Sequence, residues 1–161
     1  MDPRARELIQ ALKLEPHPEG GFYREVWRSQ IRVKPADART DRSALTTIYF
    51  LLVKGQVSRW HRVSSDEVWH FYEGEGLELF VADPGFERIE KRLLGPLNAT
   101  HSPVSTVSAE YWQAAKARGA YALVGCSVGP GFDFSDFSFL RDKPELAEKV
   151  RALGGESEAL L

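Results

Sequence analysis

Cysteine is nearly absent from this 161-residue chain, in which Cys126 is the only example. A single thiol excludes an internal disulfide and a zinc site built from several cysteines. The chain also has no run approaching the ~20 apolar residues that a membrane-spanning helix needs. Its opening residues, MDPRARELIQ, are polar and lack the apolar segment of a signal peptide. We therefore expect a cytoplasmic protein with no membrane partner.

Clustered positive charge is missing too. The net charge is −2, and basic residues never stand more than two in a row. Electrostatic capture of nucleic acid requires a basic face, so we expect no nucleic-acid partner. With 43% hydrophobic and 27% charged residues, the composition is that of a globular protein rather than a disordered one. The length and the lack of internal repeats predict one domain over residues 1–161.

Helices are expected only near the two ends of the chain. Asp2 and Pro3 suit the N-cap and first position of a short helix that ends before Pro16. A second helix is predicted over Pro144–Leu153, with Gly154 at its C-terminal cap.

Between these helices, short apolar and β-branched segments alternate with turn-forming residues. The run LTTIYFLLV, residues 45–53, is apolar and rich in β-formers, as in a strand covered on both faces. Other strands are expected within residues 21–27, 58–63, 67–73, 77–83, 88–94 and 120–128. Turn signals every ~8–12 residues predict an all-β sandwich or barrel. Its core would span about residues 15–140, followed by a C-terminal helix and tail over 142–161.

Three segments are less regular. Residues 30–43 are charged and show no period, which predicts an exposed loop. FDFSDFSFL, residues 132–140, places phenylalanines at spacing two with a one-residue slip, which predicts a bulged strand. VSTVSAEYWQAA, residues 104–115, is ambiguous because its second half also suits a helix.

The densest group of chemically useful side chains lies in Gly55–Gly76, GQVSRWHRVSSDEVWHFYEGEG. SRWHRV and EVWHFYE have strand composition and are joined by the turn-prone Ser64-Ser65-Asp66, so a β-hairpin is predicted. His61 and Glu67 lie close to its turn, where both side chains can point into one cavity.

The spacing of this stretch matches the first cupin motif, which is glycine, five residues, His-x-His, three or four residues, glutamate, six residues and glycine. Gly55, His61, Glu67 and Gly74 fall in register, and Val63 stands in place of the second histidine.

The second cupin motif, Pro-x-Gly-x-x-His followed by asparagine four residues on, aligns with SAEYWQ, residues 108–113. Gln113 stands at the histidine position and Ala117 at the asparagine position, so only the register survives. That register predicts a turn followed by a strand here, against the helical propensity of the segment.

With PHPEGGFYRE near the start, WHRVSSDEVWH in the middle and LVGCSVGPGFDFSDFSF near the end, the chain resembles one branch of the cupin superfamily. The branch consists of small single-domain proteins, similar in fold to bacterial deoxysugar epimerases and mostly without an assigned activity. The resemblance spans roughly residues 5–140 and implies a double-stranded β-helix, or jelly-roll barrel, with a pocket inside. It also implies a small-molecule ligand and a homodimer with sheets joined across subunits.

A metal-dependent enzyme is one function left open. Cupins that bind iron, manganese or zinc commonly use three histidines and a glutamate. His61 and Glu67 are the candidate metal ligands, whereas Val63 cannot coordinate and the amide of Gln113 is a poor ligand. His70 faces away from Glu67 unless the strand bulges, so we favour a surface or interface position for it. A divalent metal stays an alternative, and no cofactor is predicted.

Acid–base catalysis without a metal is the function we predict, as an isomerase or epimerase of a sugar-like or carbonyl substrate. The related epimerases pair a histidine base with a tyrosine acid and remove a proton beside a carbonyl group. His61 is the predicted base, and Glu67 would fix the tautomer of its ring. Tyr72 is included in the catalytic set, although the sequence does not rank it above Tyr23 or Tyr49 as the acid.

Binding of a small molecule without turnover is the second alternative. Aromatic side chains at strand spacing suit a sugar or another planar ligand, although such residues often form plain core. The predicted substrate-binding residues are Tyr23, Arg24, His70, Trp112 and Gln113. In the related fold the N-terminal segment borders the pocket mouth, so Arg24 could pair with an anionic group. His17 and Glu19 are further polar groups beside the double glycine.

Overall fold

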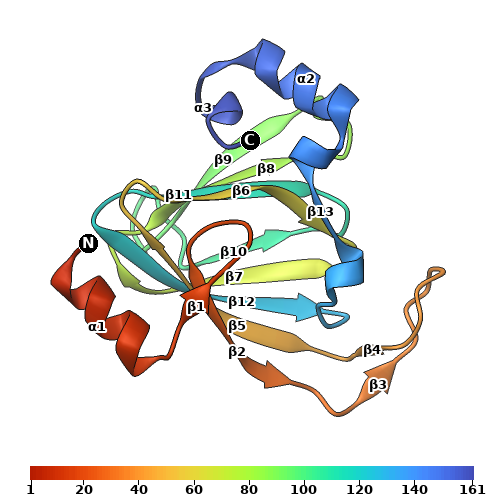
Figure 1. Cartoon of the computed structure of the whole chain (residues 1–161), viewed down its shortest axis with the longest axis horizontal. Coiled ribbons are helices and arrows are strands. Elements are labelled where there is room, and N and C mark those ends of the chain that lie inside the picture. Colours follow the sequence, from red (N-terminus) through yellow and green to blue (C-terminus); the bar gives the residue numbers. More distant parts are fainter.

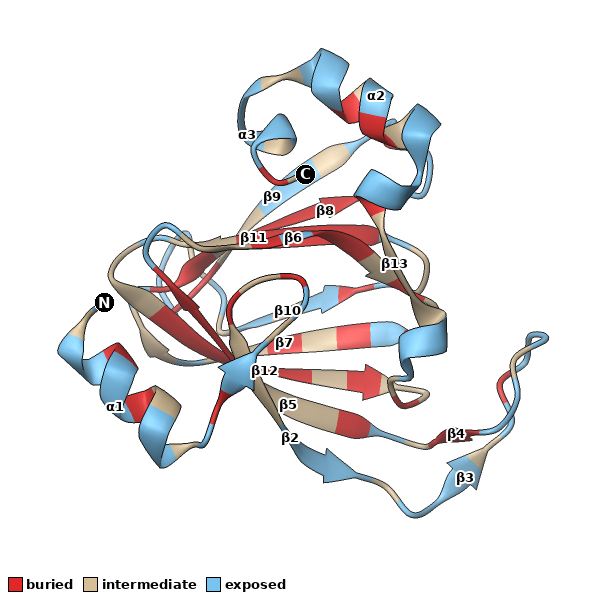
Figure 2. Cartoon of the chain, in the orientation of Figure 1, coloured by how far each residue is buried: buried red, intermediate tan, exposed pale blue.

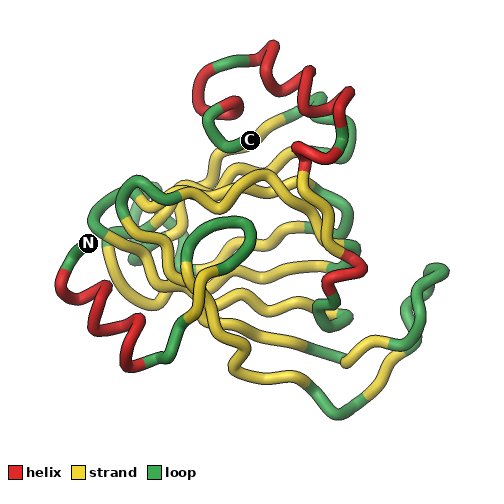
Figure 3. Tube along the Cα trace, viewed as in Figure 1, coloured by secondary structure: helices red, strands yellow, loops and turns green.

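The computed structural model describes the whole chain, residues 1–161. Two antiparallel β-sheets pack face to face, and helices near the two termini lie on the outside (Figures 1 and 3). In spatial order, the first sheet holds β1 (Glu15–Pro16), β2 (Phe22–Arg28), β5 (Thr46–Val53), β12 (Tyr121–Gly129), β7 (Asp66–Gly74) and β10 (Val104–Val107). The second holds β13 (Phe137–Phe139), β6 (Val57–Val63), β11 (Trp112–Ala117), β8 (Leu77–Ala82) and β9 (Ile89–Leu94).

The remaining elements lie outside these sheets. They are the ribbon of β3 (Arg32–Val33) and β4 (Arg42–Ser43), the α-helices α1 (Pro3–Ala11), α2 (Pro144–Leu153) and α3 (Gly155–Glu158), and the 3₁₀ turns η1 (Phe134–Asp136) and η2 (Leu140–Asp142). None of the helices has the length and apolar character needed to span a bilayer. The predicted cupin barrel with short terminal helices is confirmed.

Strand β5 shows how the alternating faces of the first sheet are used. Phe50 and Leu52 point into the largest core cluster between the sheets, whereas Leu51 and Val53 pack beneath α1 on the outer face. This double burial accounts for the unbroken apolar run (Figure 2). Helix α1 begins as predicted, because Asp2 accepts hydrogen bonds from the first free backbone N–H groups.

The C-terminal helices cover the outer face of the second sheet. Val150 of α2 and Leu160, which follows α3, pack with Trp60, Phe80 and Trp112 in a separate buried cluster. Helix α2 has the predicted bounds, and Gly154 ends it with a positive φ of 66°.

The prediction of a hairpin in Gly55–Gly76 is wrong. β6 pairs with β11 and β13, whereas β7 pairs with β10 and β12 in the other sheet. Local composition identifies the two strands but does not specify their partners, and Ser64-Ser65 carries the chain from one sheet to the other. His61 and Glu67 therefore project from opposite sheets toward the space between them.

The predicted register of the second motif is confirmed. Residues 104–117 form β10, a turn and β11, and Gln113 pairs with His61 of β6. Glu110 adopts a φ of 67° at the position where the motif has glycine, the residue that takes this conformation without strain. Tertiary pairing thus overrides the helical propensity of this segment.

Two further expectations need correction. Residues 132–140 contain the 3₁₀ turn η1 in place of a bulge, because Asp133 caps that turn by accepting from Ser135 N–H. Residues 30–43 are not wholly exposed, since Arg42 is buried and makes two 2.8 Å hydrogen bonds to Asp136 of η1. Arg39 adds a 3.2 Å ion pair to the same carboxylate. The loop therefore anchors the segment that carries the phenylalanines.

Removal of the Asp136 carboxylate tests this anchor. Asp136→Ala leaves the guanidinium of Arg42, whose side chain is 10% exposed, without its partner. We expect a loss in the free energy of unfolding, because Arg42 keeps its hydrogen bonds to Thr40 and Ser135 but loses the carboxylate that balances its charge. Asp37→Ala removes a carboxylate from Arg39 that is itself 53% exposed, so its cost should be clearly the smaller of the two. Urea unfolding of both variants measures the difference, and equal losses would contradict the assignment.

Candidate functional site

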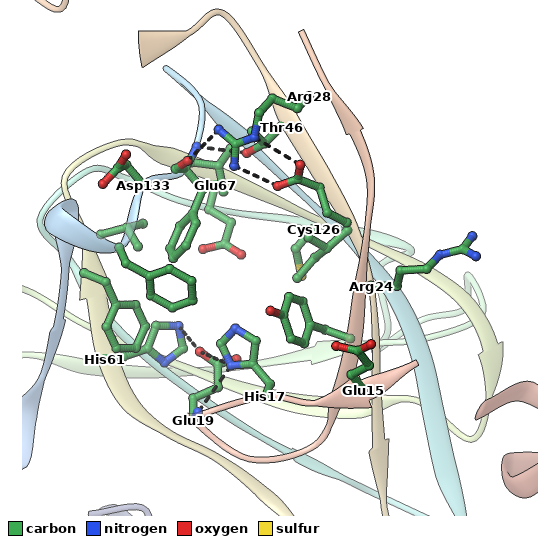
Figure 4. Close-up of a pocket in the computed structure, with 18 of the residues that line it drawn as sticks. Glu15, His17, Glu19, Arg24, Arg28, Thr46, His61, Glu67, Cys126 and Asp133 are labelled. Carbon is green, nitrogen blue, oxygen red and sulfur yellow. Dashed lines mark hydrogen bonds and ion pairs between the residues drawn. The ribbon is translucent and has the colours of Figure 1, made fainter. Parts of the chain in front are cut away.

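A cavity of about 650 Å³ lies between the two sheets and opens beside β2 and η1 (Figure 4). Four titratable side chains form its polar interior: His17, Glu19, His61 and Glu67. Each of these side chains is more than nine-tenths buried. Charged and aromatic residues of β2 and of residues 132–137 surround its mouth.

His61 enters the cavity from β6 with both ring nitrogens engaged. Nδ1 lies 2.7 Å from the backbone carbonyl oxygen of Arg59, which can only accept, so Nδ1 carries a proton. Nε2 lies 3.1 Å from Oε2 of Glu19. The ring stacks on Phe137 with centroids 5.3 Å apart. Backbone and aromatic contacts therefore fix both the tautomer and the orientation of this imidazole.

Glu19 reaches His61 from the turn over residues 17–21, which joins β1 to β2 and rises toward the second sheet (Figure 1). Arg59 of β6 donates its backbone N–H to the carbonyl oxygen of Glu19 at 2.9 Å. Gly20 has a φ of 113°, and a side chain there would collide with the carbonyl oxygen of Val57. Glycine is therefore required for the turn to lie against β6.

At neutral pH, one proton lies between the Glu19 carboxyl and Nε2 of His61. Burial raises the pKa of Glu19 to about 8, against the opposing effect of a hydrogen bond from Ser58, and burial lowers the pKa of His61. The carboxyl group therefore stays protonated and the imidazole neutral. Because Nδ1 already carries the imidazole proton, Nε2 accepts and Glu19 donates. Both groups are uncharged, which suits their burial.

His17 is also neutral and offers a free donor. Its Nδ1 accepts the backbone N–H of Glu19 at 3.2 Å, which places the ring proton on Nε2. Burial lowers the pKa of His17 to about 3. The ring contacts Tyr23 edge to face, with centroids 4.5 Å apart.

Glu67 approaches from β7 on the opposite side of the cavity (Figure 4). Its carboxylate accepts a hydrogen bond from the side-chain amide of Gln113, whose oxygen accepts the indole N–H of Trp69 at 2.9 Å. Burial raises the pKa of Glu67, and the buried Cys126 also lines the cavity. Gln113 thus occupies the motif's histidine position and anchors Glu67.

The structure changes the predicted role of Glu67 toward His61. Glu19 contacts Nε2 of His61, and the carbonyl oxygen of Arg59 fixes the tautomer. Glu67 is instead held by Gln113. The sequence did not select Glu19 because the 17–21 turn is far from His61 along the chain. The one sequence signal for Glu19 was its place in a polar pair beside Gly20-Gly21. The left-handed conformations of these glycines let the turn reach β6.

Four of the predicted site residues do not line the cavity: Gln113 lies behind Glu67, and the other three lie elsewhere. Tyr72 is 51% exposed on the outer face of the first sheet, where its hydroxyl lies over Gly125. His70 shares that outer face because Trp69 points into the core, as strand alternation requires. Trp112 is buried beneath the C-terminal helices and donates to the carbonyl oxygen of Pro84 at 3.2 Å.

Two other predicted residues lie at the cavity. Tyr23 lines it, unlike Tyr49, which belongs to the outer cluster beneath α1. Arg24 borders the mouth, but its guanidinium lies over the Tyr49 ring, 5.8 Å from the centroid, and points away from the cavity (Figure 4). Of the three tyrosines considered, Tyr23 is therefore the one available to a ligand.

The residues present do not fit the metal centre that the motif could have supplied. Val63 has no donor atom, and both ends of the Gln113 amide are engaged by Glu67 and Trp69. Histidine, cysteine and carboxylate side chains nowhere form a group of three that could hold a metal ion. We therefore derive no chemical step through a metal.

Paired sheets around a polar cavity, with both motifs meeting at His61, Glu67 and Gln113, define a cupin barrel. Residues 6–140 match the family model described as Cupin superfamily (DUF985). The chain belongs to this family.

Solved structures support the same assignment. A hypothetical protein from Leishmania major is 33% identical, with a TM-score of 0.84 over 92% of this chain and 95% of that one. A protein from Shewanella oneidensis is 34% identical, with a TM-score of 0.79 over 92% and 93% of the two chains. A dTDP sugar isomerase from Desulfovibrio desulfuricans is 12% identical, with a TM-score of 0.53 over 74% and 80%, so the predicted kinship to sugar-modifying enzymes extends to the fold alone. No match was found among curated proteins.

The protonated state of Glu19 predicts a specific pH dependence of stability. Its pKa is raised from 4.5 to about 8 on folding, so the unfolded chain releases this proton first as pH rises. The free energy of unfolding should therefore fall between pH 4.5 and 8 through this group. Glu19→Gln removes the contribution, and its stability should decline less steeply, by up to about 1.4 kcal/mol per pH unit. Urea unfolding from pH 6.5 to 8 compares the two proteins, and parallel curves would contradict the protonated carboxyl.

Proposed function

We propose that this protein is an isomerase or epimerase that moves a proton at a carbon beside the carbonyl group of a small, sugar-like substrate, without a metal ion. One observation carries the proposal: the Glu19 carboxyl and the His61 imidazole lie 3.1 Å apart in a buried cavity, where burial favours the uncharged form of each group. Each already has the protonation state that its role requires.

His61 is the proposed base and Glu19 the proposed acid. A substrate entering between them would replace their mutual hydrogen bond. The lone pair of Nε2 takes the proton from carbon, while the carboxyl proton of Glu19 passes to the carbonyl oxygen and yields an enediol. Return of the proton to the neighbouring carbon completes isomerisation, and its return to the opposite face of the same carbon completes epimerisation. Both groups then regain their starting states.

The surroundings favour this division of roles. Burial shifts the two pKa values in the directions that these roles need. It keeps the imidazole unprotonated and the carboxyl protonated near pH 7. The carbonyl oxygen of Arg59 stabilises the imidazolium that forms when Nε2 gains a proton. Exclusion of water strengthens these interactions.

Glu67 and Tyr23 are proposed to hold the substrate. Glu67 faces the pair from the opposite sheet and is fixed by Gln113, so it can accept hydrogen bonds from substrate hydroxyls. The hydroxyl of Tyr23 and the Nε2–H of His17 are donors on the remaining wall. Phe132 and Phe137 offer apolar surface to the carbon face of a sugar.

Binding without turnover is the second candidate, and one observation favours it. Both nitrogens of His61 already have partners in this structure, so the base acts only if a substrate displaces Glu19. A ligand held elsewhere in the cavity would leave the Glu19–His61 hydrogen bond intact.

Exchange of carbon-bound hydrogen in deuterated water separates the two candidates. The protein is incubated with a panel of aldoses, ketoses and their phosphorylated and nucleotide-linked forms, and deuterium uptake is followed by NMR. We expect uptake into one class of compound, with His61→Gln and Glu19→Gln each losing roughly 10²-fold or more of the rate. His70→Gln, a histidine change outside the cavity, should retain it. A compound that binds without exchanging deuterium would support the binding protein and contradict the isomerase.

A further inference from the structure

The interior of the cavity contains no positive group for an anionic ligand. His17 and His61 are neutral for the reasons given above, and both have their deprotonated nitrogens occupied by other groups. The acidic side chains of the interior, Glu19 and Glu67, are carboxyl groups. A phosphate or carboxylate placed among them would be desolvated next to potential negative charge, which is costly.

Cations occur only around the mouth, where other groups engage them or turn them away. Arg28 makes two hydrogen bonds to Glu25, at 3.0 and 2.7 Å, and a third to the carbonyl oxygen of Phe132 at 3.1 Å. Arg24 lies over Tyr49 and points outward (Figure 4). Lys13 is exposed at the rim, where water screens its charge.

Acidic residues balance these rim cations. Glu15, Glu25 and Asp133 line the same mouth. Anion recognition in proteins depends on arginine or lysine donors, or on several backbone N–H groups, directed at the ligand. Of the three rim cations, only the solvent-exposed Lys13 has no such partner, and none of the three lies among the interior groups.

We propose that the cavity selects an uncharged ligand bearing hydroxyl and carbonyl groups and rejects its phosphorylated, nucleotide-linked or carboxylate-bearing counterparts; this choice of substrate class deepens the proposed function and rests on it. The interior donors and acceptors match such a molecule. Nε2–H of His17 and the hydroxyl of Tyr23 can donate to oxygen, and Glu67 can accept from hydroxyl groups.

Cys126 provides an internal probe of this selectivity. It is the only cysteine, is buried, and lines the cavity. Iodoacetamide and iodoacetate have nearly the same size and differ in charge, and each forms an S–C bond with the thiolate as iodide leaves. The mass of the intact protein reports each alkylation rate. The ratio of the two rates in the urea-unfolded chain gives the intrinsic preference of this thiol.

We expect the amide-to-acid rate ratio to be at least tenfold higher in the folded protein than in the unfolded chain. The measurement is made at urea concentrations where the rate does not vary with urea, so that reaction proceeds through the cavity. A folded-state ratio equal to or below the unfolded one would overturn the proposal. Burial raises the pKa of the Cys126 thiol, so both alkylation rates are low, and the ratio of the two rates, in which the thiolate fraction cancels, carries the result.

Asp133→Asn serves as the matched control at the rim. Asparagine can keep the cap on Ser135 while one negative charge is removed from the mouth. The ratio should stay within twofold of the parent value. A fall of the amide-to-acid ratio in this variant to the value of the unfolded chain would assign the selectivity to the rim. That result would overturn an interior origin. Deuterium exchange tests the isomerase, and the alkylation ratio tests the selectivity. The two results are independent because a binding protein without turnover can still exclude anions.

Discussion

The site depends on the contact between Glu19 of the 17–21 turn and His61 of β6, two side chains that remain uncharged because they are buried together. The turn over residues 17–21 supplies the carboxyl, and β6 supplies both the imidazole and the carbonyl oxygen that fixes its tautomer. An ionised carboxylate or imidazolium here would have lost its water without full compensation. A single shared proton satisfies both groups, and the rest of the cavity is organised around this neutral pair.

The same cavity has a different chemistry from that of a metal-binding cupin. Val63 and Gln113 stand where the motif has histidines, and Gln113 serves as a link between Trp69 and Glu67. The carboxyl that would otherwise coordinate a metal is thereby fixed as a hydrogen-bond acceptor. The interior groups carry little charge. A ligand would therefore be recognised by hydrogen bonding and by shape.

Much of the fold could be predicted from the sequence, because strand periodicity, helix caps and motif register are local signals. The motif register also predicted the turn and strand that contain Gln113, which the structure pairs with His61. Strand partners are not local, which is why β6 and β7 were expected to pair and do not. The candidate site was predicted in part: His61 and Glu67 line the cavity, whereas the role of Glu19 follows from a tertiary contact made through Gly20. Tyr72 failed as a site residue because alternation turns it outward.

The position of the shared proton tests this account most directly. Long-range ¹H–¹⁵N NMR of histidine-labelled protein at pH 7 reports the protonation of each ring nitrogen, and a His61→Gln variant assigns the signals. We predict a neutral His61 ring with the proton on Nδ1 and with Nε2 accepting a hydrogen bond. An imidazolium signal, with both nitrogens protonated beside an ionised Glu19, would contradict the neutral pair.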